Sequence, residues 1–153
     1  MPDTDPMNVE AALEKLNTAL RLQYRSSLEL SLVAGSLVGL EWQPLEPLLW
    51  SYAQAELDDL RRLVQKIVAL GGAPATDPAP FHTAPDTEKA LVTLVDHECE
   101  TLAARHQVLP DTGQEPRSEA LEHRIEHLIM RKQEQVDTLR RALGRIASER
   151  AEA

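Results

Sequence analysis

The sequence has few residues of the kinds that build disulfides, sheets or membrane spans. Its 153 residues include one cysteine, Cys99, which cannot form a disulfide within the chain and fits a reducing compartment. Aromatic residues make up 3%, whereas Leu, Ala, Glu and Arg are frequent, a bias that favours helices. No apolar run is long enough to span a bilayer, and the first residues lack the pattern of a secretory signal. We therefore expect an all-α, cytoplasmic protein without a membrane partner.

Basic residues are also fewer than acidic residues. The chain has 16 Lys and Arg against 25 Asp and Glu, a formal net charge of -9. Binding to phosphates needs a basic surface, so nucleic acid is not expected as a partner. Hydrophobic residues make up 42% of the chain, enough for one domain with a real core. We expect a disordered acidic tail at 1–7 and a single four-helix domain at 8–151.

Glycine is scarce, and clusters of glycine and proline divide the chain into four predicted helices. Apolar residues recur at helical spacing over roughly 8–38, 44–70, 86–108 and 116–143. Asn8 is the expected N-cap of the first helix. The first and second helices, and the third and fourth, are joined by short links. Each pair is therefore predicted to be antiparallel neighbours.

The link between the second and third helices is different. Residues 72–85 contain four prolines, at 74, 78, 80 and 85. An extended chain of this kind rises about 3.1 Å per residue and reaches some 40 Å, as far as the roughly 35 Å third helix is long. The link is therefore predicted to cross the length of the bundle, which makes the second and third helices parallel. A flexible loop is the alternative interpretation.

Each apolar stripe is interrupted near the middle of its helix by a strong polar residue. The four interruptions are Gln23, Glu56, Glu98 and Lys132. Asp59 and Gln135 lie one turn from Glu56 and Lys132 on nearly the same faces. The stripe of the third helix also continues to Arg105. In helices of similar length the middle positions meet at one level, so the sequence predicts a polar layer in an apolar core.

This pattern resembles the ferritin-like superfamily, and bacterioferritin in particular. The likeness is carried by Leu16-Asn17 before Gln23, by the run from Glu56-Leu57-Asp58-Asp59 to Gly72-Ala73-Pro74, and by Glu98. Di-iron members of that superfamily have a Glu on each of two helices and Glu-x-x-His on each of the other two, in a bundle with one long crossover. The resemblance implies a ferritin-like four-helix bundle and a role in handling iron or another divalent metal.

The chain departs from the family pattern at most of its ligand positions. Gln23 stands where the family has Glu, Asp59 replaces His, and Lys132 and Gln135 replace Glu-x-x-His. Leu57 takes the place that resembles the haem-ligating Met, so haem is not expected. Two divalent ions would bring four positive charges to a layer that already holds an ammonium. We therefore expect weak metal binding and residual ferroxidase-type activity at most.

Two functional hypotheses follow from the polar layer. In the first, the protein is of the bacterioferritin type and handles iron through an altered centre that binds or oxidises metal less well than its relatives do. In the second, Lys132 holds Glu56 and Glu98 in a metal-free cluster, and the bundle is a non-enzymatic dimeric scaffold or binding protein. A third interpretation gives the layer no role, because long side chains can extend from a stripe to solvent.

Two features outside the predicted core indicate a metal or a partner. His123 and His127 are spaced i, i+4 and form a candidate surface metal site. The first two helices carry a second apolar line, which predicts a homo-oligomer, at least a dimer, through this pair of helices. Its residues are Leu28, Leu32, Leu57, Val64 and Val68.

Overall fold

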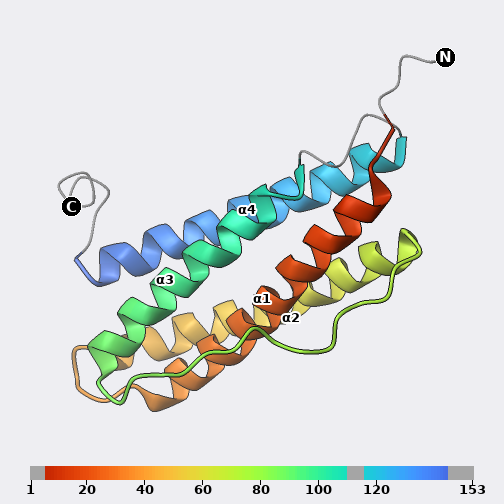
Figure 1. Ribbon diagram of the computed structural model, residues 1–153. Coiled ribbons are helices and arrows are strands. Elements are labelled where there is room, and N and C mark those ends of the chain that lie inside the picture. Colours follow the sequence, from red (N-terminus) through yellow and green to blue (C-terminus); the bar gives the residue numbers. More distant parts are fainter. Residues whose placement is uncertain (1–5, 110–115, 145–153) are drawn as a thin grey trace.

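The protein is a bundle of four long helices (Figure 1). The computed structural model describes residues 6–109 and 116–144. The elements are α1 (Val9–Ser36), a 3-10 turn η1 (Gln43–Leu45), α2 (Glu46–Ala69), α3 (Thr87–His106) and α4 (Pro116–Ala142). Within those ranges there is no strand, and no helix is both long and apolar enough to cross a membrane. The predicted all-α four-helix bundle is confirmed, although α1 ends at Ser36 rather than near Val38.

Some of the predicted organisation lies outside the described residues. This applies to residues 1–5 of the expected tail, to the link at 110–115, and to residues 145–151 of the expected domain. Met7, at the end of the expected tail, is buried against the core.

The helix ends follow from local chemistry. Asn8 caps α1, its side chain accepting a hydrogen bond of 3.1 Å from the Ala11 N–H. Asp86 caps α3 in the same way, at 3.0 Å from the Lys89 N–H. Gly71 follows the end of α2 with a φ of +84°, a conformation that glycine adopts without steric cost.

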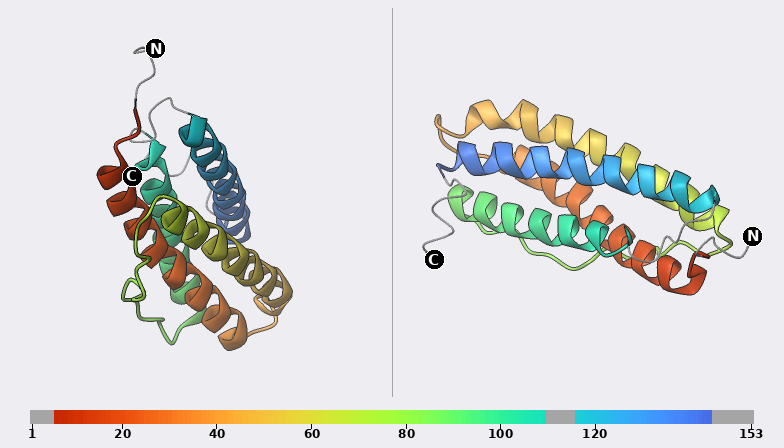
Figure 2. Two further views of the ribbon diagram at one scale, coloured as in Figure 1. Left: turned by 90° about the vertical axis from the view of Figure 1, so that its right-hand side faces the viewer. Right: turned by 90° about the horizontal axis from the view of Figure 1, so that it is seen from above.

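The connectivity makes α2 and α3 parallel. Helix α1 runs antiparallel to α2, and the long link returns along the bundle so that α3 starts near the end at which α2 starts (Figure 1). Helix α1 packs against both α2 and α3, and α4 packs mainly against α3. The four helices run roughly along the length of the bundle, with α1 inclined to α3 (Figure 2). The predicted crossover, with parallel second and third helices, is confirmed.

The crossover is held along α1 by side-chain hydrogen bonds. Asn17 donates from Nδ2 to the Ala73 carbonyl at 3.1 Å and accepts at Oδ1 from the Ala75 N–H at 2.7 Å. The Tyr24 hydroxyl donates to the Ala75 carbonyl at 3.0 Å. A proline-rich segment forms few hydrogen bonds of its own, so these contacts from α1 fix its path.

The apolar core consists of two clusters, one toward each end of the bundle. The cluster nearer the α1–α2 link includes Leu30, Val33, Leu49, Leu91, Leu94 and Leu139. The cluster at the other end includes Leu16, Leu20, Leu63, Ile67, Ile125 and Leu128. The mid-helix residues that interrupt the stripes lie between the two clusters in sequence on every helix, so a polar layer divides the core.

We predict that Asn17→Ala lowers the free energy of unfolding by about 1–2 kcal/mol, because two backbone groups of the crossover lose their partner. Urea denaturation measures the change. Thr18→Ala is the matched control, since Thr18 is exposed and donates only to the Glu14 carbonyl of its own helix. An equal loss in the two variants would show that Asn17 does not anchor the crossover.

Candidate functional site

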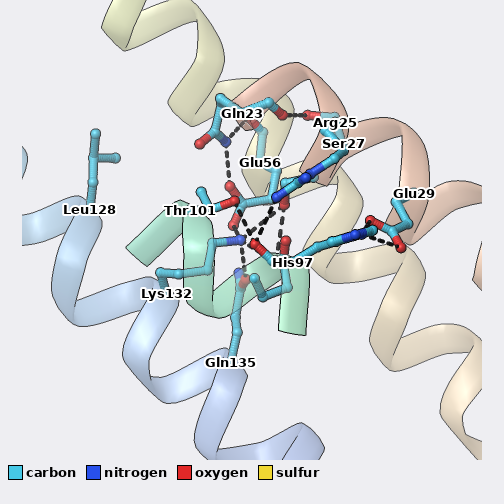
Figure 3. A network of polar contacts seen from close by, with 12 residues as sticks. Gln23, Arg25, Ser27, Glu29, Glu56, His97, Thr101, Leu128, Lys132 and Gln135 are labelled. Carbon is cyan, nitrogen blue, oxygen red and sulfur yellow. Dashed lines mark hydrogen bonds and ion pairs between the residues drawn. The ribbon is translucent and has the colours of Figure 1, made fainter. Parts of the chain in front are cut away.

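The candidate site is the polar layer at mid-bundle, to which every helix contributes (Figure 3). All six residues predicted for it are buried: Gln23, Glu56, Asp59, Glu98, Lys132 and Gln135. They meet because each lies near the middle of its helix, and the four helices overlap over their central turns. A buried charged group is strongly destabilising unless it is paired, so the partners of each group decide what the layer can do.

Lys132 is at the centre of the layer and is surrounded by oxygen atoms. Its Nζ lies 2.6 Å from Glu56 Oε1 and forms an ion pair with Glu98 Oε2. The same nitrogen lies 3.0 Å from Ser26 Oγ and 3.0 Å from Gln135 Oε1. Each helix therefore supplies one of the four oxygens that face this ammonium. The sequence predicts Lys132 within reach of both glutamates, and the structure places it there.

Arg105 is a second buried cation in the layer, and the sequence analysis missed its role. Its Nη2 lies 3.0 Å from Glu56 Oε2 and also donates to Gln23 Oε1, while Nη1 donates to the Leu128 carbonyl at 2.7 Å. Gln23 in turn donates from Nε2 to Glu56, including its backbone carbonyl at 2.8 Å. Its position in the sequence could have indicated this role, because Arg105 follows Glu98 by two helical turns on the same stripe.

Lys132 and Arg105 together set the ionisation of Glu56. Burial by itself would raise the pKa of this carboxyl group, but the charges of Lys132 and Arg105 outweigh burial and lower the pKa to about 2. Glu56 is therefore an ionised carboxylate at neutral pH, with one cation against each of its oxygens.

Asp59 lies at the edge of the layer and pairs with a different cation. Its Oδ1 is 2.9 Å from Arg131 Nη1, and the Arg131 side chain is 32% exposed. Its Oδ2 has no hydrogen-bond partner among the described residues. Burial raises the pKa of Asp59, and the charge of Glu56 raises it further, against the opposing effect of Arg131. The charged form of Asp59 is thus held less favourably than that of Glu56.

A second polar cluster joins α1 to α3 beside the layer, and the sequence analysis did not anticipate it. His97 Nδ1 lies 2.8 Å from Glu29 Oε1, and Glu29 is buried. Arg25 Nη2 donates to the His97 carbonyl at 3.1 Å and to Glu100 at 3.2 Å. Burial raises the pKa of Glu29, opposed by its contact with His97 (Figure 3). These contacts link α1 to α3 beside the layer.

The predicted surface histidines stand apart from the layer. His123 and His127 are both exposed on α4. Over residues 6–109 and 116–144, no group of three or more His, Cys, Asp or Glu side chains is placed to hold a metal ion. A metal at this pair would need further ligands from outside the described part of the chain or from water, so the surface site stays a prediction.

The family of the chain follows from its match to known proteins. A family model described as a ferritin-like domain matches residues 13–148, which is most of the sequence. The chain therefore belongs to the ferritin-like family. Among the curated proteins, none matches this chain.

Solved structures of the same fold support this assignment. The chain is similar to a structure titled as ferritin-like, diiron-carboxylate proteins from Bacillus anthracis str. Ames, with 25% identity, a TM-score of 0.82, and 88% of this chain and 96% of that chain covered. It is also similar to Rhodobacter capsulatus bacterioferritin, with 15% identity, a TM-score of 0.75, and 87% and 83% covered. A third likeness is to the bacterioferritin-related thioferritin from Bacteroides fragilis, with 17% identity, a TM-score of 0.80, and 95% and 92% covered.

The residues of the layer do not fit the pair of iron ions that this fold implies. An iron pair needs free carboxylate oxygens and, in the common pattern, two histidines. Here Lys132 pairs with both Glu56 and Glu98, and Arg105 pairs with the second oxygen of Glu56. Glu98 Oε1 and Asp59 Oδ2 have no hydrogen-bond partner among the described residues, but none of the six predicted layer residues is a histidine. The layer therefore presents two iron ions with two resident cations and no imidazole nitrogen from those six residues.

We predict a specific acid dependence of stability from Glu56. Its pKa is lowered from 4.5 to about 2, so its ionised form stabilises the fold fully above about pH 4.5, and this contribution is lost as the pH falls toward 2. Glu56→Gln should lower the free energy of unfolding at pH 7 by about 3 kcal/mol, because it leaves two buried cations undercompensated. The deficit relative to wild type should shrink as the pH falls below about 4.5. Urea denaturation across the pH range measures it.

Asp59→Asn is the matched comparison, with the opposite expected sign. Because the pKa of Asp59 is raised above its ordinary value of 3.8, its ionisation in the folded state costs stability at neutral pH. The variant should be at least as stable as wild type at pH 7 and lose any advantage below about pH 3.8. Equal losses in Glu56→Gln and Asp59→Asn would contradict the assignment of the two roles.

Proposed function

We propose that this protein is a homo-oligomeric ferritin-like subunit whose bundle centre is held by ion pairs and does not oxidise iron. The observation that carries the proposal is the environment of Lys132, whose ammonium is faced by one oxygen from each of the four helices. A cation supplied by the chain thus fills the centre, and the role that remains for the bundle is that of a scaffold or binding protein.

Charge balance supports this reading. Glu56 and Glu98 are matched by Lys132 and Arg105, so these four side chains sum to zero charge without any added ion. Two divalent ions would add four positive charges next to two buried cations, where repulsion is poorly screened. The ligand set is thus degenerate in charge as well as in residue type. Haem is not part of the proposal, because Leu57 occupies the position of the haem-ligating Met in the resemblance.

The second candidate is iron or other divalent-metal handling through a weak site. It is favoured by the 25% identity, over 88% of this chain, to the structure titled as diiron-carboxylate proteins. Three acids, Glu56, Asp59 and Glu98, are present in the layer and one oxygen of Asp59 has no partner among the described residues. A metal bound through this oxygen or through Glu98 Oε1, which also has no hydrogen-bond partner among the described residues, would lie close to Lys132 and Arg105 and be repelled by them.

We predict that the wild-type protein, purified and given ferrous iron, retains well under one ion per chain after desalting and oxidises iron no faster than buffer does. Its Tm should be the same with iron and with chelator, since a ligand that binds only the folded state would raise it. Metal analysis, oxygen consumption and thermal melts provide the three readouts. Two retained ions per chain with a raised Tm would establish the second candidate instead.

The proposed oligomer uses the outer face of α1 and α2. Four large apolar side chains on these adjacent helices are exposed by about half: Leu28 (48%), Leu32 (53%), Leu57 (55%) and Val68 (58%). The two helices pack against each other, so these side chains lie on neighbouring surfaces. Exposed apolar surface of this kind marks an interface, and a second copy meeting the same face is the simplest closed arrangement.

We predict a homodimer at least, dissociated by charge on this face. Leu32→Asp should shift the mass measured by light scattering to that of a monomer while helicity is retained, because it places a carboxylate in the interface. Met130→Asp is the control, since Met130 is exposed on α4, away from the proposed face. A shell is the other assembly to look for, because the Bacteroides fragilis thioferritin is described as dodecameric. A wild-type monomer at high concentration would refute the oligomer.

A further inference from the structure

The polar layer is divided into two half-sites, each filled by one cation that belongs to the chain. We infer that Lys132 fills an oxygen cage able to take one small free cation in its place, and that Arg105 fills the other half independently. The inference rests on the proposed function and deepens it, because it states what class of ligand the centre would accept once a tethered cation is removed.

Glu56 is the boundary between the two half-sites. Its Oε1 faces Lys132 Nζ at 2.6 Å, and its Oε2 faces Arg105 Nη2 at 3.0 Å. Glu56 thus has one cation on each of its carboxylate oxygens. Lys132 and Arg105 therefore contact different oxygens of Glu56 and do not compete for them. Removing one cation leaves the contacts of the other in place.

The half-site around Lys132 has the composition of a cation cage. Two carboxylate oxygens, from Glu56 and Glu98, a hydroxyl oxygen of Ser26 and an amide oxygen of Gln135 face one point. Ser26 also donates to Glu98 Oε2 at 3.0 Å, which fixes both side chains. Oxygen donors of this kind suit ammonium groups and hard divalent ions such as Mn²⁺.

The half-site around Arg105 is expected to remain occupied by its guanidinium when Lys132 is replaced. The guanidinium reaches Glu56 from two turns along α3 and donates to Gln23 Oε1 and to the Leu128 carbonyl. None of these partners is a partner of Lys132 except Glu56, whose two oxygens are divided. Loss of Lys132 then leaves two glutamates and one cation, a net charge of -1 that favours uptake of one cation.

The test is cation rescue of Lys132→Ala. Truncation removes a three-carbon chain and its ammonium, which n-propylammonium matches in size and charge. We expect the Tm to fall by roughly 10 °C in chelator, since a buried ion pair loses one partner. Millimolar n-propylammonium or manganous chloride should restore at least half of that loss, with one Mn²⁺ retained per chain. If Lys132→Ala does not fold in chelator, the yield on refolding from urea, with and without each cation, is measured instead.

Two controls separate a cage from a general salt effect. Lys132→Met keeps the space filled with an apolar chain and should respond to neither cation. Leu121→Ala creates a cavity on the same helix at a buried apolar position and should also be insensitive. The inference is overturned if Lys132→Ala is not rescued by either cation, or if Leu121→Ala is rescued to the same extent.

Independence of the half-sites predicts a stoichiometry. With Lys132→Glu and Gln135→His together, Arg105 still occupies its half, so one Mn²⁺ per chain should be retained. Adding Gln23→Glu and Arg105→Leu should raise this to two. Two ions in the double variant would show that Arg105 does not close its half-site. Iron retained by the wild type would instead refute the proposed function, so the two failures are distinguishable.

Discussion

The structure depends on neutralising Glu56 in a place that water does not reach. A carboxylate buried without a partner would be protonated or would unfold its surroundings, since desolvation costs several kcal/mol per ion. In this protein the charge of Glu56 is neutralised by Lys132 and Arg105, each of which contacts one of its two carboxylate oxygens. Because these cations come from α3 and α4 and the carboxylate from α2, the same contacts that satisfy the charge also fix how the helices meet.

Glu56 and Glu98 have the residue type of the di-iron pattern that the sequence resembles, yet their oxygens face nitrogen atoms of the chain. A tethered ammonium cannot dissociate from the chain. In the proposed function, the stability of the bundle is therefore independent of metal supply, and the bundle serves binding or assembly.

The fold and most residues of the polar layer could be predicted from the sequence, for a physical reason. A polar residue in the middle of an apolar stripe stands out, and this located Gln23, Glu56, Glu98 and Lys132. The proline-rich link indicated the crossover because its reach matches the length of a helix. Arg105 was not identified because a basic residue in the last turn of a helix is usually a favourable, exposed partner of the helix dipole.

The cluster of Arg25, Glu29 and His97 was missed for a related reason. Helix α1 packs against two neighbours, α2 and α3, so it is buried on more than one side. The sequence analysis assigned no role to Arg25 and Glu29, which lie off the main stripe, whereas both contact α3. The period of the apolar residues identifies the main buried face of a helix, but it does not predict which element packs against a second buried face.

The distribution of charge between the two helical hairpins has a consequence for folding. The α1–α2 hairpin brings two acids to the layer, Glu56 and Asp59, and the α3–α4 hairpin brings Glu98 with three cations. Neither hairpin alone has a balanced centre, so a half-folded bundle would expose or bury unmatched charge. These opposite charges favour docking of the two hairpins, so we expect the two halves to fold in one cooperative transition.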